Sequence, residues 1–151
     1  MRFIASLSNN KNYMKKLFFA SFALAFLMVS CGPNPEKSRI YMEKGLDYMY
    51  ASQLDEAIAN FDKAIKYDEN NYEAYYYRGC AYSNNYNQEK AFENWNKAIE
   101  IKPDYADPYF NIGLIYRRAN DYAMACYYFK LAEKYGRASM YDYVKYCDYY
   151  E

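Results

Sequence analysis

The sequence predicts an all-α protein: an α-solenoid of three helix-turn-helix repeats closed by a C-terminal capping helix. Three observations predict this fold class. Residue types recur every 34 positions between residues 38 and 139. Within each period the apolar residues follow the spacings of 3, 4 and 7 that are typical of amphipathic helices. Short polar stretches rich in turn-forming residues divide each period into two halves. A fixed period of this length indicates stacked helix pairs.

Composition excludes several function classes. The 151 residues carry 19 basic and 19 acidic side chains, so the net charge gives no indication of nucleic-acid binding. Histidine, the commonest general base and zinc ligand, is absent. The sequence also has no Gly-rich phosphate loop, no G-x-S-x-G and no C-x-x-C. We therefore expect neither an enzyme nor a cofactor or metal site.

The N-terminal segment has the features of an export signal. Lys15 and Lys16 precede an apolar run over residues 17–29, which is too short to span a bilayer comfortably. This pattern is typical of a secretory signal peptide. We expect the signal peptide to occupy residues 1–30. Met14 is the expected true start, because the residues before it add nothing to the signal.

The end of this segment, LMVSCG, resembles the lipobox of bacterial lipoproteins, although Met28 stands where that family prefers leucine. The resemblance implies cleavage before Cys31, lipidation of the Cys31 thiol and anchoring in a membrane. Because Gly32 rather than aspartate follows the cysteine, we expect the outer membrane of a bacterial cell envelope. Residues 31–37 then form the lipidated cysteine and a short tether.

The repeat itself consists of six series of residues in one register, with a step of 34. Three series are of small residues, one is of large aromatic residues, and two are of tyrosines. The series are Gly45, Gly79 and Gly113; Ala57, Ala91 and Ala125; Ala64, Ala98 and Ala132; Phe61, Trp95 and Phe129; Tyr41, Tyr75, Tyr109 and Tyr143; and Tyr48, Tyr82, Tyr116 and Tyr150. We expect the small residues to let two antiparallel helices approach closely while the aromatic rings fill the space beside them.

This pattern resembles the tetratricopeptide repeat. The resemblance covers residues 38–71, 72–105 and 106–139 as three full repeats. It continues over 140–151 as the first helix of a fourth repeat, which would cap the open end of the stack. The sequence departs from the family in having tyrosine at the usual tryptophan position and Glu69 and Arg137 where proline is frequent.

Three cysteines lie within the repeats and the cap. Cys147 occupies the small-residue position that glycine holds in the repeats, so packing explains it. Cys126 is predicted to point toward the helix that carries Cys147. A disulfide between the two would pin the cap, provided that their Cα atoms lie within about 7 Å; free thiols are the alternative. Cys80 has no predicted partner.

In the tetratricopeptide family the first helices of the repeats line a concave groove. Carried over by register, the groove residues here are Met42, Leu46, Met49 and Tyr50 from repeat one, Tyr76, Tyr77, Cys80 and Asn84 from repeat two, and Phe110, Asn111, Leu114, Arg117 and Arg118 from repeat three. The predicted groove has a Met- and aromatic-rich floor and a basic edge, which suits an adaptable protein contact. The four positions that hold a terminal carboxylate in chaperone-binding members carry other residues here, so we do not expect that activity. Ordinary helix surface, with binding elsewhere, is the alternative.

Together these features predict a lipid-anchored adaptor or scaffold of the bacterial envelope that binds a protein or peptide partner. Two other functions stay open. The tyrosine-lined groove could bind a glycan or cell-wall fragment by stacking, or Cys80 could be a redox-active thiol. The partner's identity and the membrane face on which the protein is displayed do not follow from the sequence.

Overall fold

The computed structural model of the protein describes residues 32–145 and 147–150. The predicted signal peptide and Cys31 lie outside these residues. Within the described ranges every regular element is a helix, which confirms the all-α prediction. The elements are α2 (Pro35–Tyr50), α3 (Leu54–Tyr67), α4 (Tyr72–Asn84), α5 (Gln88–Ile101), α6 (Ala106–Arg118), α7 (Tyr122–Lys134), α8 (Tyr141–Val144) and the 3₁₀ helix η2 (Cys147–Tyr149).

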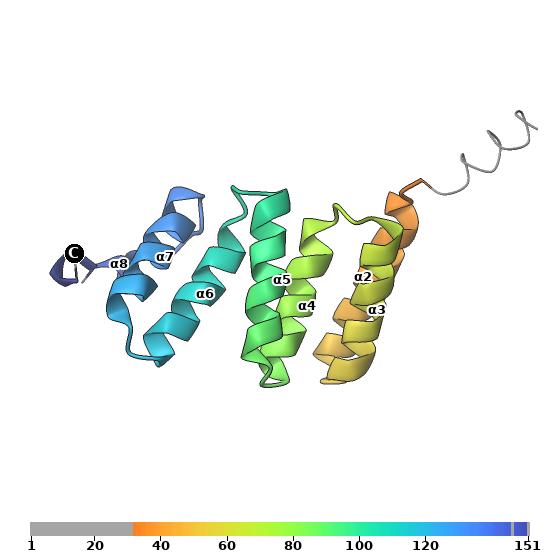
Figure 1. Ribbon diagram of the computed structural model, residues 1–151, viewed down its shortest axis with the longest axis horizontal. Coiled ribbons are helices and arrows are strands. Elements are labelled where there is room, and N and C mark those ends of the chain that lie inside the picture. Colours follow the sequence, from red (N-terminus) through yellow and green to blue (C-terminus); the bar gives the residue numbers. More distant parts are fainter. Residues whose placement is uncertain (1–31, 146, 151) are drawn as a thin grey trace, which may run out of the picture. The chain divides into compact units, whose positions relative to one another are not determined.

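The helices of the unit over residues 34–151 form antiparallel pairs that stack in chain order. The pairs are α2 with α3, α4 with α5, and α6 with α7, and the second helix of each pair packs on the first helix of the next (Figure 1). This is the α-solenoid that the 34-residue period predicts. None of the helices in the described ranges combines the length and the hydropathy needed to cross a bilayer.

The prediction that residues 31–37 form a tether is wrong for residues 35–37, which make the first turn of α2. The Asn34 side chain accepts a hydrogen bond from the Lys37 backbone N–H at 2.9 Å and so caps the helix. Pro35 stands at the start of the helix, where its missing N–H breaks no hydrogen bond. The negative charge of Glu36 in the first turn interacts favourably with the positive end of the helix dipole. These are helix-start signals, and they place the beginning of α2 before residue 38.

A glycine and an aromatic ring form the centre of each repeat. The Phe61, Trp95 and Phe129 side chains are at most 2% exposed. Each of these rings lies directly against the glycine of the preceding helix. A Cβ atom built on Gly45 would lie 2.5 Å from the Phe61 ring, and the corresponding distances at Gly79 and Gly113 are both 2.6 Å. The alanines of the repeat are equally buried. The predicted packing of small residues against aromatic rings is therefore confirmed.

Most tyrosines of the repeat flank this core, whereas Tyr109 is part of it. Tyr109 is buried, Tyr41 and Tyr75 are half-buried, and Tyr48 is 38% exposed. Tyr41 stacks on Tyr67 with 5.5 Å between the ring centroids, and Tyr116 stacks on Tyr128 at the same distance. Partial exposure suits a ring that carries a hydroxyl group, because the hydroxyl keeps access to water.

The turn inside each repeat has a left-handed residue at one register position. Ser52, Tyr86 and Asn120 have φ angles of 60°, 58° and 60°. Each of these residues ends the preceding helix. The residue that follows it donates its backbone N–H to the carbonyl oxygen five positions before that residue, at 2.9–3.0 Å. The three polar stretches predicted to be turns are confirmed. The shared left-handed position was not predicted, because none of its three residues is glycine.

The cap is shorter than the sequence predicts. Instead of one helix over 140–151, the described residues form the single turn α8 and the 3₁₀ helix η2. A helix of a single turn is marginal on its own, and packing against the last repeat holds this segment in place. The predicted register still holds in the packing, because Tyr143 packs on the Phe110 and Phe129 rings with centroid distances of 4.8 and 5.1 Å.

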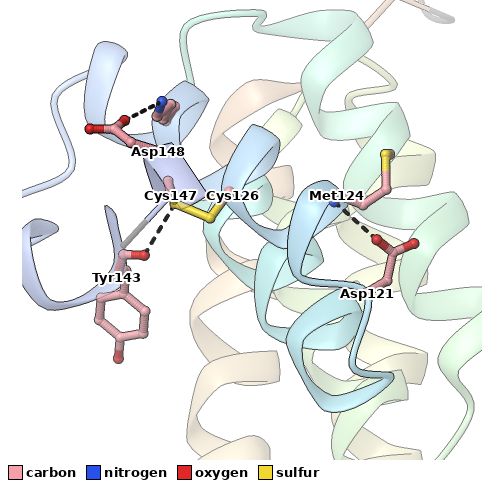
Figure 2. Close-up of a disulfide and its surroundings, with 7 residues drawn as sticks. Asp121, Met124, Cys126, Tyr143, Cys147 and Asp148 are labelled. Carbon is pink, nitrogen blue, oxygen red and sulfur yellow. Dashed lines mark hydrogen bonds and ion pairs between the residues drawn. A yellow bond between two sulfur atoms is a disulfide. The ribbon is translucent and has the colours of Figure 1, made fainter. Parts of the chain in front are cut away.

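A disulfide attaches the cap to the last repeat. Figure 2 shows the bond between Cys126 of α7 and Cys147 of η2, whose Cα atoms lie 5.3 Å apart. Cys147 is completely buried and Cys126 is 8% exposed. Lys130 and Asp148 form an ion pair next to the bond, at 3.4 Å. Of the two possibilities that the sequence left open, the structure has the disulfide. A cross-link closing a 21-residue loop stabilises a fold by roughly 3 kcal/mol in the chain-entropy model.

The contact between glycine and aromatic ring gives a first test. Gly113→Val should lower the free energy of unfolding by roughly 1–3 kcal/mol, because the added methyl groups would overlap the Phe129 ring. Urea denaturation followed by circular dichroism measures the change. Ala59→Val, on the exposed face of α3, is the matched control and should have little effect. Equal stability of Gly113→Val and the wild type would contradict this account of the core.

Candidate partner-binding groove

A cavity of about 270 Å³ lies between α4 and α6, the first helices of repeats two and three. Six of the predicted groove residues line it: Tyr76, Cys80, Asn84, Asn111, Leu114 and Arg118. Five of these side chains come from register positions whose residue type does not recur, and the sixth, Leu114, has its counterpart in Leu46 of repeat one. The recurring small and aromatic residues hold the helices in register and, apart from Trp95, do not line the cavity.

Ser83, Trp95 and Ile115 complete the lining. Trp95 and Ile115 were not among the predicted groove residues. The signal for Trp95 was present in the sequence, since Trp95 replaces phenylalanine in the aromatic series Phe61, Trp95 and Phe129. Its indole Nε1 is the one buried side-chain nitrogen or oxygen without a hydrogen-bond partner in the described part of the chain. The larger ring therefore builds one wall of the cavity, while its Nε1 packs against Gly79, where an added Cβ atom would lie 2.6 Å away.

Asn111 connects the two helices at the inner end of the cavity. Its Nδ2 lies 3.4 Å from the Tyr76 hydroxyl oxygen and 3.4 Å from the Cys80 sulfur, so it is placed to donate weak hydrogen bonds to both. Tyr76 also makes edge-to-face contacts with Tyr77 and Tyr105, at centroid distances of 5.0 and 5.1 Å. Burial raises the pKa of the Tyr76 hydroxyl well above its usual range, so that this group is a neutral donor and acceptor.

Cys80 is a half-buried, uncharged thiol in the lining of the cavity. Desolvation raises the pKa of this thiol, and the hydrogen bonds from its polar neighbours only partly oppose the shift. Since the thiolate is the reactive form, a raised pKa lowers its reactivity at neutral pH. The environment of Cys80 therefore disfavours the alternative that this residue is a redox-active thiol.

The predicted groove residues of repeat one lie apart from this cavity. Met42, Leu46 and Met49 are half-buried and pack, together with Tyr77, against the core around Phe61. Tyr50, by contrast, is 83% exposed. Repeat one thus offers a shallow methionine-rich surface next to α4, whereas repeats two and three enclose the cavity.

Two predicted groove residues of repeat three, both on α6, contact the cap and do not line the cavity. Phe110 is only 8% exposed, because Tyr143 and Phe129 cover its ring and the Arg137 guanidinium lies 3.8 Å from the ring centroid. Arg117 lies over the Tyr143 ring at 5.0 Å. The prediction that Phe110 presents its ring to a partner is therefore wrong. The register rule assumes a regular fourth helix, and the actual cap folds over that end of α6.

Arg118 differs from the other arginines of the described residues in its surroundings. Arg39 pairs with Glu36 and Glu43, Arg78 with Asp62, and Arg137 with Asp107. Arg117 lies over the rings of the cap. Arg118 is exposed at the mouth of the cavity, and among residues 32–145 and 147–150 it has neither a carboxylate nor an aromatic partner.

These features define a helical-repeat protein with a small polar cavity between neighbouring repeats. Models of the tetratricopeptide repeat match residues 45–85 and 87–119, and residues 106–135. Together these matches cover more than half of the 151 residues. The chain belongs to the tetratricopeptide repeat family, and its fold is that of a protein–protein interaction module.

Among curated proteins, the photosystem I assembly protein Ycf3 of Synechococcus sp. (strain CC9605) is 26% identical over 114 residues, which cover 74% of this chain and 66% of Ycf3. DnaJ homolog subfamily C member 3 of Gallus gallus is 34% identical over 92 residues, covering 55% of this chain and 18% of that protein. The chain thus spans at most two thirds of the length of these relatives.

Solved structures share the fold. The crystal structure of MamA is 28% identical, with a TM-score of 0.62, over 68% of this chain and 60% of MamA. The first TPR of Spaghetti (RPAP3), bound to the HSP90 peptide SRMEEVD, is 18% identical with a TM-score of 0.68, over 78% of this chain and 94% of that one. At 18% identity the second likeness concerns the fold alone.

The raised pKa of Cys80 gives a second test. In a Cys31→Ala variant, kept oxidised to preserve the disulfide, the Cys80 thiol should react with iodoacetamide more slowly at pH 7 than a cysteine in an unfolded chain. The rate should also keep rising with pH beyond the usual range of thiol titration, because the group deprotonates later. Mass spectrometry of the labelled peptide measures both effects. The same chain in urea is the control, and faster labelling in the folded state would favour the redox alternative.

Proposed function

We propose that this protein is a lipoprotein of the bacterial cell envelope whose repeat domain binds a segment of a protein partner and acts as an adaptor or scaffold. The observation that carries the proposal is the cavity between α4 and α6, where six side chains of the predicted groove converge, five of them at positions whose residue type does not recur. Residues that only hold the repeats together recur every 34 positions. Side chains that converge without recurring are available for recognition instead.

Two relatives support this reading. The structure of Spaghetti, which has the same fold, holds a peptide of HSP90, so this arrangement of helix pairs can bind an extended segment. Ycf3, which matches three quarters of this chain, is named for assembling photosystem I. From these relatives we infer only a general role for this chain: that of an assembly factor or adaptor that acts through protein–protein contacts.

The envelope location rests on two independent features. The segment over residues 14–31 has the pattern of a lipoprotein signal ending at Cys31, the proposed lipid anchor. The disulfide between Cys126 and Cys147 fits an oxidising compartment, since disulfides are rare in the reducing cytosol. We place the protein at the outer membrane because Gly32 follows the cysteine.

Partner capture provides the test of the groove. Full-length wild type and a Tyr76→Ala, Leu114→Ala double variant are expressed in the source cells, cross-linked and purified, and the captured proteins are identified. The double variant should lose most of the partner that the wild type captures, because it removes both the aromatic and the aliphatic wall of the cavity. Far-UV circular dichroism should show unchanged helicity.

Tyr127→Ala is the matched control, since Tyr127 is 57% exposed on α7 and does not line the cavity. Equal capture by all three chains would place the partner surface elsewhere. If instead wall fragments or an oligosaccharide array bind the wild type, and the double variant abolishes this binding, the groove is a glycan site and the proposal is wrong.

The lipid anchor has its own test. Cells fed with labelled palmitate should incorporate the label into the wild type and not into Cys31→Ala, and only the wild type should fractionate with membranes. Cys80→Ala is the control and should retain the label, because Cys31, the proposed lipidation site, is unchanged in it. An unlabelled wild type would rule out the lipoprotein assignment while leaving the groove untouched.

A further inference from the structure

We infer that the cavity between α4 and α6 binds an acidic side chain of the partner segment and that Arg118 pairs with its carboxylate. This inference rests on the proposed function, because it names the chemistry that the groove selects. It concerns an aspartate or glutamate within the partner chain. The four family positions that hold a terminal carboxylate carry Met42, Leu46, Asp107 and Asn111 here, so this contact would use different residues.

The first argument is charge. The cavity lining includes one guanidinium group and no carboxylate. The other four arginines in the described part of the chain are already paired with carboxylates or lie over aromatic rings. Arg118 is the exception, and it is located at the cavity. An arginine offers two parallel N–H groups that match the two oxygens of a carboxylate, which makes an acidic group the natural complement.

The second argument is the supply of donors on the opposite wall. Asn84 occupies on α4 the register position that Arg118 occupies on α6, and Ser83 precedes it. An amide and a hydroxyl can both donate to the carboxylate from that wall. Asn111, on the same helix as Arg118, holds only two long contacts of 3.4 Å. The polar groups of the cavity thus offer more donors than the described residues use.

The third argument is shape. Leu114 and Ile115 lie on the same helix as Arg118, within the turn that precedes it, and the Trp95 ring adds a further wall. Side chains on a helix lean toward its N-terminus, so the Arg118 side chain extends over this apolar surface. The methylene groups of a glutamate can contact Leu114 while its carboxylate reaches the guanidinium. A volume of about 270 Å³ accommodates one such side chain, and larger parts of the partner would lie outside.

Peptide selection tests the inference. A random decapeptide library is selected on the immobilised full-length chain, and the dissociation constants of enriched, labelled peptides with amidated C-termini are measured by fluorescence anisotropy. We expect enriched peptides to share one acidic position flanked by apolar residues. Changing that position to glutamine, or making Arg118→Glu, should weaken binding roughly tenfold, as removal of one side of a charged pair does. A lysine at the shared position should restore binding to Arg118→Glu.

Lys66→Glu is the control, because it changes the net charge by the same amount on an exposed face of α3 outside the cavity. It should bind the peptides like the wild type. If peptides bind and the Tyr76→Ala, Leu114→Ala variant loses them, but Arg118→Glu does not, the groove function stands and the acidic pocket is refuted. Enriched peptides without a shared acid refute it as well. If no peptide is enriched, or if binding survives both the double variant and Arg118→Glu, the proposed function fails together with the inference.

Discussion

The structure depends on one close approach, repeated three times: a glycine of the first helix against an aromatic ring of the second. There is no room for a methyl group at this contact in any repeat, since a Cβ atom would lie 2.5–2.6 Å from a ring atom. The contact sets the distance between the two helices and their rotation relative to each other. Once it is set, the opposite face of the first helix must point away from the pair, and that face carries the candidate groove.

Recurring and non-recurring residues therefore have different roles: most recurring residues form the core, and the non-recurring ones contribute most of the cavity lining. The small and aromatic residues at recurring positions supply most of the buried core, and the tyrosines flank it with their hydroxyls near water. The frequent tyrosine is thus largely a packing feature. Between α4 and α6, however, the lining is heterogeneous: a neutral tyrosine and thiol, two amides, aliphatic side chains and a single arginine. Such a mixture suits recognition of a particular segment more than it suits repeat packing.

The C-terminal cap determines where this surface ends. Pinned by the disulfide, the cap brings Tyr143 over Phe110 and places the same ring beneath Arg117. It thereby covers the Phe110 ring and engages the exposed Arg117 side chain in a contact with Tyr143. Arg118 is left as the basic group at the cavity. A segment whose length and sequence differ from a full repeat thus shapes the candidate site that lies beside it.

The sequence by itself determined the architecture. A 34-residue period with glycine and aromatic residues at fixed positions buries its apolar residues when the helices stack in pairs. It also placed six of the nine cavity-lining residues on the groove face. The tertiary structure alone decided the rest. An irregular cap covers Phe110 and provides the ring over which the exposed Arg117 lies, whereas a register rule applies only to regular repeats. Trp95 joined the lining from a second helix, since its larger ring reaches between neighbouring first helices. The disulfide, and the lack of a carboxylate or aromatic partner for Arg118 among the described residues, depend on distances between residues far apart in the chain. The periodicity along one helix does not determine such distances.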